Sequence, residues 1–430
     1  MQGKRILDAI CCLIISLYIV MGIQLVPLHG DESTLIFMGR DFHYHMQGDT
    51  DRIFVADWDT LNGDEATEQQ LRLINGTLSK YLYGMVAYVS GYSLDDINDQ
   101  WAWSLGWDWN HENGHVPSDD LLLISRYTSA SLLILSAIAF YGLGVSIGGR
   151  GVALIASAYY VLNPAILMNG RRAIMESGML AFTILAVWMA LLALRHRHFG
   201  WYIALGLVSG LAVASKHTSV VTIAIVFGVS GLYLLSQRQN LLKLIGAGVL
   251  SLIVFFGLNP AWWLNPVQAT RTVLELRQDL LAGQVEFFGG YESTQAQVVG
   301  FARQTFVVPP MYAETDLDGF LSQQTDAIAR YQASPFHGIS LGGTWIGGII
   351  LAGFVILGLG WLWRDEDYDR ASRWLITAWL LAMVLLTLAL TPLEWQRYYI
   401  PIYPVIGLLG AIGLYASTIH AKLWITTHRN

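Results

Sequence analysis

The sequence predicts an all-α integral membrane protein in which about ten transmembrane helices carry two large extracytoplasmic loops. Three observations support this fold class. The 430 residues are 54% hydrophobic and only 13% charged, whereas a soluble chain carries roughly a quarter charged residues. The mean hydropathy is +0.45. Apolar runs recur along the chain, each close to the roughly 20 residues that a helix needs to cross a bilayer.

Ten apolar runs define the predicted membrane-spanning helices. They cover residues 6–26, 121–147, 151–168, 177–194, 199–215, 217–236, 241–258, 340–362, 374–391 and 398–418. Two long polar stretches interrupt them, outer loop one (27–120) and outer loop two (259–339). We therefore expect a single polytopic membrane domain over residues 1–430, with an uncleaved anchor at its start and no separate soluble C-terminal domain.

The distribution of lysine and arginine predicts the orientation in the membrane. With the N-terminus in the cytoplasm, 12 cations fall in cytoplasmic segments: Lys4, Arg5, Arg150, Arg195, Arg197, Arg238, Lys243, Arg364, Arg370, Arg373, Lys422 and Arg429. Both long loops then face outward, and 17 of the 32 acidic residues lie between Asp31 and Asp120. We expect a multi-pass protein of the plasma membrane, or of the ER membrane in a eukaryote, with both termini cytoplasmic.

Charge and cysteine content exclude two further classes of protein. The net charge of −7 offers no basic surface, so nucleic acid is not expected as a partner. The two cysteines, Cys11 and Cys12, are adjacent in the first apolar run, which excludes a disulfide framework.

The outer loops contain amphipathic segments. Residues 65–89 and residues 269–284 have apolar positions at helical spacing, and each predicts a helix that lies on the membrane surface. Four tryptophans then fall within nine residues: Trp101, Trp103, Trp107 and Trp109. They are typical of an interfacial aromatic belt; the alternative is a platform for a sugar ring or an acyl chain.

Acidic and basic residues recur at the outer ends of the predicted spans. They occupy four separate turns, with Asp31 and Glu32 in the first, Arg171, Arg172 and Glu176 in the second, Lys216 and His217 in the third, and Glu394 and Arg397 in the fourth. Each has a simple alternative, because Arg172 and Glu176 can pair across one helical turn and Lys216 or Arg397 can snorkel to the interface. Together, on one membrane face, they predict a site that holds an anion with cations and keeps a carboxylate as a base.

Five segments resemble the GT-C superfamily of polyprenyl-phosphate-sugar glycosyltransferases, in the branch of protein O-mannosyltransferases and lipid A aminoarabinose transferases. They are "HGDEST", "GRRAIMESGMLAF", "LAVASKHTSVV", "LNPAWWLNP" and "EWQRYYIPIYP". The resemblance covers residues 20 to 415 or thereabouts. Two features depart from it: "INGTLSKYLYG" replaces the His-Pro-Pro that often precedes the outer amphipathic helix, and the chain ends soon after the last span.

The resemblance implies a hexosyl- or mannosyltransferase that uses a polyprenyl-phosphate-linked sugar at the extracytoplasmic face. The implied acceptor is a hydroxyl of a protein, a lipid or a glycan, and protein glycosylation is one such process. The implied catalytic residues are Asp31 as base, with Glu32 and Glu176. The donor phosphate is assigned to Lys216, Arg172, Arg171 and Arg397. Acceptor or sugar contacts are assigned to His29, Trp107, Trp109 and Glu394.

A single base opposite the leaving group predicts inversion at the anomeric carbon. No cofactor is required, because lysine and arginine offset the phosphate charge; the alternative is a divalent cation at Asp31 and Glu176. Two other functions fit the sequence, a polytopic transporter and a catalytically silent membrane scaffold. Against a transporter, the ionisable groups gather at the outer face and not at the midplane.

Overall fold

The computed structural model describes residues 2–55, 61–314 and 319–428, and the regular structure in these ranges is helical. The amino-terminal part contains α1 (Gln2–Met21), η1 (Ile23–Leu25), α2 (Gly30–Phe37), α3 (Arg40–Gln47), α4 (Gly63–Ile74), α5 (Thr77–Val89), η3 (Leu94–Asp96) and α6 (Trp107–Glu112). The central part contains α7 (Asp119–Leu162), α8 (Pro164–Arg171), α9 (Glu176–His196), α10 (Phe199–Ser215), α11 (Ser219–Ser236) and α12 (Leu242–Leu258). The last part contains η4 (Pro260–Trp262), α13 (Pro266–Phe288), α14 (Thr294–Ala302), η5 (Arg303–Val307), α15 (Phe320–Gln323), α16 (Thr325–Ala333), α17 (Trp345–Arg364), α18 (Arg370–Leu390), η7 (Gln396–Ile402) and α19 (Tyr403–His428).

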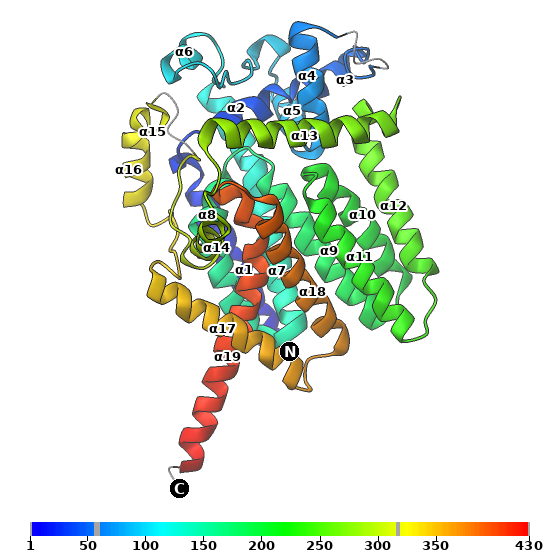
Figure 1. Ribbon diagram of the computed structural model, residues 1–430, viewed down its shortest axis with the longest axis vertical. Helices are drawn as coiled ribbons and strands as arrows, with labels where there is room; N and C mark the ends of the chain where they lie inside the picture. The colour runs from blue at the N-terminus through cyan, green and yellow to red at the C-terminus, as the bar shows by residue number, and fades with distance from the viewer. Residues whose placement is uncertain (1, 56–60, 315–318, 429–430) are drawn as a thin grey trace.

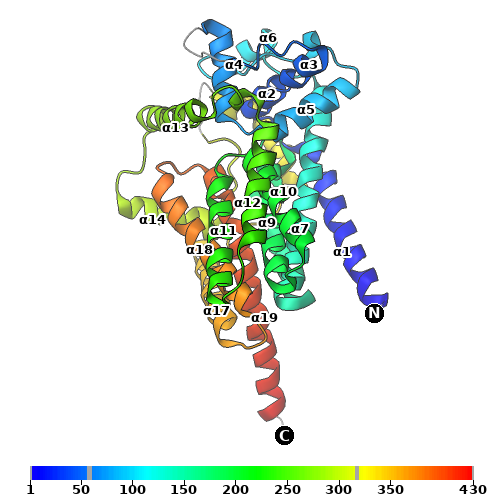
Figure 2. The same cartoon turned by 90° about the vertical axis from the view of Figure 1, so that its right-hand side faces the viewer.

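The molecule has two layers, a bundle of long helices and a cap of short ones (Figures 1 and 2). In the described ranges, seven segments are long and apolar enough to cross a membrane: Arg5–Leu25, Asp119–Leu162, Glu176–His196, Ser219–Ser236, Trp345–Arg364, Arg370–Leu390 and Gln396–Ile419. Two shorter apolar helices, Phe199–Ser215 and Leu242–Leu258, accompany them. The predicted all-α membrane fold is therefore confirmed.

The helix α7 is two predicted spans joined at Gly149. This glycine has φ +75°, a conformation that costs glycine little, and the chain reverses there. The two arms then pack side by side, with Ser136 Oγ 2.8 Å from the Tyr160 hydroxyl. The second arm ends at Leu162, where Asn163 caps α8 through two backbone amides, so the predicted span 151–168 is divided between two helices.

Glycines permit close approach of helices in the bundle, as is common in membrane proteins. Gly206 and Gly210 of α10 face the backbone of α12, and a Cβ at either position would lie 2.6 Å from a carbonyl oxygen of Ala247 or Ser251. Gly358 of α17 faces Leu409 of α19 in the same way. Small side chains therefore set the spacing of two helix pairs.

The cap is built from both outer loops. Outer loop one forms α2 to α6, and α13 from outer loop two runs across the end of the bundle beneath them (Figure 1). The predicted amphipathic segment 269–284 is confirmed as part of α13. The single helix predicted over 65–89 is wrong, because Asn75 and Gly76 adopt extended conformations that separate α4 from α5.

The break at Gly76 has a packing cause. A Cβ at this position would overlap the carbonyl of Ser215 at the end of α10, so the α4–α5 corner is pressed onto the bundle. Buried charges hold the corner in place: Asp41 of α3 accepts from Arg72 of α4 at 2.8 Å and from Lys80 of α5 at 2.6 Å. All three side chains are at most 5% exposed.

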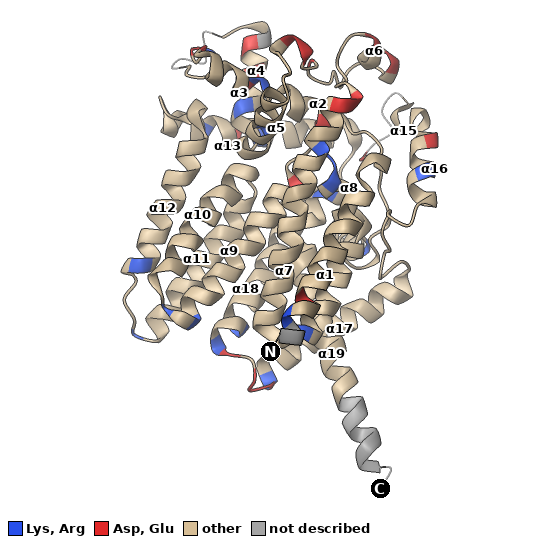
Figure 3. Ribbon diagram, turned by 180° about the vertical axis from the view of Figure 1, so that it is seen from behind, with Lys and Arg blue, Asp and Glu red and all other residues tan. Residues whose placement is uncertain are grey.

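Charge is distributed unevenly between the two ends of the molecule. Acidic residues are prominent in the cap, whereas lysine and arginine mark the loops at the opposite end of the bundle (Figure 3). The start of α1 and the end of α19 lie at that opposite end (Figure 1). This arrangement agrees with the side of the membrane predicted for the cap, and the orientation itself stays a prediction.

Candidate active site

The first helix of the cap presents Asp31 and Glu32 at its N-terminus. His29 is the N-cap residue of α2: its Nδ1 accepts from the Asp31 amide at 3.1 Å, and its own amide donates to Glu32 at 3.1 Å. This reciprocal capping box fixes the start of the helix. Because Nδ1 accepts this hydrogen bond, Nε2 carries the imidazole proton and donates to Glu314 Oε2 at 2.7 Å.

His29 is therefore a buried anchor. It is 2% exposed, and both of its nitrogens are used within the protein. The prediction that His29 contacts the acceptor or the sugar stays a prediction, for a ring that the protein covers in this arrangement.

The two adjacent acids have different environments. Glu32 is fully buried and accepts from Arg126 at 2.8 and 2.7 Å and from the Ala173 amide at 2.9 Å. Burial acts to raise the pKa of Glu32, but Arg126 outweighs it and the pKa lies below the usual value. Both oxygens of Glu32 accept hydrogen bonds from the protein, and its assignment as a catalytic residue stays a prediction.

Asp31 is the accessible member of the pair, with 27% of its side chain exposed. Its carboxylate is paired with Arg397 from η7, and Arg397 also pairs with Glu314 from outer loop two. Burial acts to raise the pKa of Asp31, and the positive charge of Arg397 outweighs that effect, so the pKa lies below its usual value. Asp31 is therefore ionised near neutral pH and able to accept a proton.

A second ion pair stands beside the first. Lys216, at the end of α10, donates to Glu176 Oε1 at 2.8 Å, and Glu176 Oε2 is buried without a hydrogen-bond partner. Glu176 lies within electrostatic range of Arg397. The structure thus brings together the predicted residues Asp31, Glu176, Lys216 and Arg397 from four separate turns.

The two arginines at the end of α8 serve different neighbours. Arg172 is 1% exposed and donates to the carbonyl oxygens of Pro27 and Tyr312. Burial lowers its pKa to about 10, against the opposing charges of Glu32 and Glu314. It lies directly behind the Asp31 cluster. Its role toward a phosphate stays a prediction.

Arg171 faces away from this cluster. Its guanidinium donates to the carbonyls of Tyr18, Ile19 and Phe336 and to the Tyr331 hydroxyl. The side chain is fully buried, and these contacts fasten α8 to α1 and to outer loop two. Its assignment to the donor phosphate stays a prediction.

Glu394 and Trp109 also lie apart from the cluster. Glu394 pairs with Arg303 and accepts from Gln304 at 3.0 Å, which connects the turn before η7 to η5. Trp109 packs against His115 in a tilted arrangement with ring centroids 4.8 Å apart. Among the described residues, neither side chain bonds to Asp31, Arg397 or Glu314. Their assignment to the acceptor stays a prediction.

Trp107 does belong to an aromatic group beside the carboxylates. The Trp107, Trp101 and Phe320 rings have centroids 5.1 to 5.7 Å apart. Trp103 extends the group to within 6.1 Å of the His29 ring and is 44% exposed. We call these four residues the aromatic wall. It lies directly against the start of α2, where a Cβ on Gly30 would be 2.9 Å from the Trp103 ring.

Three residues of the site were not predicted from the sequence. Arg126 lies inside an apolar span, and a charge there usually has a buried partner, so its position was a usable signal. Glu314 lies in an irregular loop that offers no periodic pattern. Arg277 of α13 is half-buried, has no carboxylate partner among the described residues and donates to the Ile74 carbonyl. Arg277 and Asp31 both act electrostatically on Tyr398.

In residues 2–55, 61–314 and 319–428, no three side chains of the His, Cys, Asp and Glu types lie close enough together to hold a metal ion. The acids nearest the centre of the site, Asp31 and Glu176, are paired with cations.

The fold has a counterpart among solved structures. The structure is similar to that of ArnT from Cupriavidus metallidurans bound to undecaprenyl phosphate, with a TM-score of 0.50 and 14% identity over 96% of this chain and 60% of that chain. The chain therefore has the GT-C fold that the resemblance implied from the sequence, and it spans about 60% of the length of the ArnT chain.

A family model and a second solved structure also match. Residues 123–263 match the dolichyl-phosphate-mannose-protein mannosyltransferase family. The Pmt1–Pmt2 complex of S. cerevisiae bound to the sugar donor matches with a TM-score of 0.41 and 15% identity, over 69% of this chain and 35% of that chain. No curated protein matches by sequence.

Proposed function

We propose that this protein transfers a hexose or mannose-like sugar from a polyprenyl-phosphate donor to an acceptor hydroxyl, with inversion and with Asp31 as the base. The observation that carries the proposal is the convergence of an accessible carboxylate, Asp31, with the cations Arg397 and Lys216 at the junction of cap and bundle. The match of residues 123–263 to the mannosyltransferase family supports it.

The proposed reaction balances as a single displacement. The acceptor oxygen bonds to the anomeric carbon, and the bond from that carbon to the phosphate oxygen breaks. The phosphate leaves with the bonding electron pair as a polyprenyl phosphate, and the acceptor proton passes to Asp31. Attack opposite the leaving group inverts the anomeric configuration.

The cations of the site would stabilise the leaving phosphate. Negative charge grows on the departing phosphate, and fixed donors in a water-poor site stabilise such charge strongly. Lys216 and Arg397 are the closest candidates, with Arg172 behind them. Lys216 and Arg397 are paired with the carboxylates of Glu176 and Asp31. An arriving phosphate would replace these carboxylates as the partner of the two cations. Asp31 would then be free to accept the proton of the acceptor. These cations supply the charge that a divalent metal would otherwise provide.

Arg277 is a further candidate for the donor phosphate. It is half-buried on α13, beside the end of α4, and desolvation lowers its pKa. A cation near the site with no carboxylate partner among the described residues is suited to an incoming anion.

The test is turnover of a defined donor. Purified protein in detergent would be mixed with undecaprenyl-phosphate mannose and, separately, dolichyl-phosphate mannose, and release of free polyprenyl phosphate would be measured. Asp31→Asn should abolish release while leaving donor binding intact, and Asp51→Asn, an exposed acid of the same loop, is the matched control. Normal turnover by Asp31→Asn would show that the base is another group.

A further inference from the structure

Outer loop two places one carboxylate, Glu314, beside the candidate base. Its Oε2 accepts from His29 Nε2 at 2.7 Å, and its Oε1 is paired with Arg397, the partner of Asp31. Arg172 acts on Glu314 electrostatically, and only 13% of the Glu314 side chain is exposed. The protein therefore already binds an anion at this position, through two cations and one hydrogen-bond donor.

The segment that carries Glu314 is bound by the same two arginines. We call residues 308–314 the strap. Arg172 Nη2 donates to the strap at the Tyr312 carbonyl, 2.7 Å away, and Arg397 binds the Glu314 carboxylate. Both arginines are candidates for the donor phosphate. A phosphate that approaches them therefore competes with the strap.

Among the described residues, the charges joined to Asp31 and Arg397 sum to zero. The acids of this network are Asp31, Glu32, Glu176 and Glu314. Its cations are Arg126, Arg172, Lys216 and Arg397. An uncompensated charge in a buried site is costly. A polyprenyl-phosphate-linked sugar is a phosphodiester with one negative charge, so its entry preserves neutrality if one carboxylate leaves.

Glu314 is the carboxylate that can leave with the least rearrangement. Glu32 is fully buried, and Asp31 and Glu176 lie in the first turns of α2 and α9. Glu314 instead belongs to an irregular segment. Its departure from Arg397 requires no helix to unwind.

The backbone at the start of the strap is strained. Val308 has φ +52° and ψ +63°, a left-handed conformation that a β-branched residue rarely adopts. It follows the π-helical turn η5, a rare structure that is frequent at functional sites. Such a backbone persists only where surrounding contacts hold it. Arg172 and Arg397 hold the far end of the strap, so the loss of their contacts lets Val308 relax.

We propose that Glu314 is an internal competitor for the donor phosphate, and that the strap stays closed until the phosphodiester replaces Glu314 on Arg397. In the closed form the strap carboxylate occupies this arginine. In the donor-bound form Arg397 binds the phosphate, Glu314 moves away with the strap, and Asp31 faces the donor without a second carboxylate beside it. This inference rests on the proposed function, because it takes the donor to be a polyprenyl-phosphate-linked sugar.

The test is the affinity for undecaprenyl phosphate, which needs no turnover. Titration calorimetry on the full chain in detergent should show that Glu314→Gln binds this lipid more tightly than the wild type by about tenfold, because one competing charge-assisted hydrogen bond is lost. The glutamine amide still accepts from His29, so the start of α2 is preserved.

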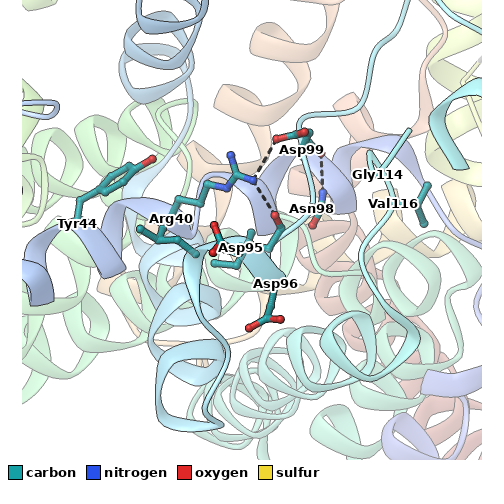
Figure 4. Close-up of a pocket in the computed structure, with 10 residues that line it drawn as sticks. Arg40, Tyr44, Asp95, Asp96, Asn98, Asp99, Gly114 and Val116 are labelled. Atoms are coloured by element: carbon teal, nitrogen blue, oxygen red, sulfur yellow. Dashed lines mark hydrogen bonds and ion pairs between the residues drawn. The ribbon is translucent and has the colours of Figure 1, made fainter. Parts of the chain in front are cut away.

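A second acid–arginine pair of the cap provides the matched control. In the pocket beside α3 and η3, Arg40 pairs with Asp99 at 3.1 Å, and 55% of the Asp99 side chain is exposed (Figure 4). Asp99→Asn thus removes a carboxylate from an arginine outside the charge network of Asp31. Its affinity for undecaprenyl phosphate should equal that of the wild type.

Two results would overturn the inference. One is an unchanged or weaker affinity in Glu314→Gln. The other is a cryo-EM structure with bound undecaprenyl phosphate in which Glu314 still pairs with Arg397. If Glu314→Gln binds the lipid more tightly but no sugar-linked donor is ever consumed, the proposed function fails and the competition stands. If the donor is consumed and both proteins bind the lipid alike, the transfer stands and the competition fails.

Discussion

Arg126 holds both carboxylate oxygens of Glu32, with its Nε 2.8 Å from Oε1 and its Nη2 2.7 Å from Oε2. This ion pair gives the two neighbouring acids, Asp31 and Glu32, different roles. Glu32 turns into the bundle and joins α2 to α7, whereas Asp31 stays at the surface with Arg397. The separation follows from the roughly 100° between adjacent residues on a helix.

Replacing Glu32 tests this division. Glu32→Gln leaves a buried arginine without its counter-charge, which typically costs about 3–5 kcal/mol. The melting temperature in detergent should therefore fall sharply. Asp31→Asn should melt close to the wild type, because Asp31 is partly exposed and Arg397 keeps Glu314. Equal loss in both variants would contradict the assignment.

Lys216 is expected to bind the donor phosphate. Lys216→Ala removes one cation and leaves the buried Glu176 carboxylate unpaired, so binding of undecaprenyl phosphate should weaken by tenfold or more, on the order of 1.4 kcal/mol. Titration calorimetry on the purified protein measures this directly. Lys243→Ala, at the opposite end of the bundle, is the matched control. An unchanged affinity in Lys216→Ala would remove this residue from the donor site.

The pH dependence of turnover should report on Arg397. Asp31 acts as a base only when it is ionised, so activity falls as the pH drops through its pKa. Arg397 is the main group that lowers this pKa against burial, so in Arg397→Gln the pKa rises and the acid limb of kcat/KM moves to higher pH. A reduced rate with an unmoved acid limb would mean that Arg397 does not act on Asp31.

Replacing Glu314 should shift the acid limb of kcat/KM in the opposite direction. Its negative charge raises the pKa of Asp31, so in Glu314→Gln the pKa falls. The acid limb of kcat/KM then moves to lower pH, and the plateau rate drops because Asp31 becomes a weaker base. The amide still accepts from His29, which preserves the capping box. A shift toward higher pH would contradict the proposed network.

The buried charges of the cap predict acid sensitivity. Burial acts to raise the pKa of Asp41, but Lys80 and Arg72 outweigh it, so the folded-state pKa is depressed. Its stabilisation is complete above the unfolded pKa of about 3.9 and is lost as the pH falls through the folded value. Asp41→Asn should lower the melting temperature at neutral pH and flatten its acid dependence. A variant that kept the wild-type acid profile would show that another group controls it.

The sequence predicted the parts of the structure that have strong periodic or charge signals. The ten apolar runs all fall on helices, and the four charged turns supply Asp31, Glu176, Lys216 and Arg397 to one cluster. The break at Gly76 could not be predicted, because it depends on contact with α10, far away in the sequence.

The side-chain partners were harder to predict than the positions. Arg171 and Arg172 are adjacent, and only the direction of the α8 terminus decides which one faces the site. Glu314 lies in a loop, and no pattern in the loop sequence predicts that Glu314 contacts His29 and Arg397. Long-range pairing of this kind is fixed by tertiary packing.

The most direct measurement is a cryo-EM structure of the full chain in nanodiscs with undecaprenyl phosphate. The account predicts that the phosphate lies within hydrogen-bonding distance of both Lys216 and Arg397, with the Asp31 carboxylate facing the position of the anomeric carbon. A phosphate bound elsewhere, with Asp31 still locked to Arg397, would contradict the central claim.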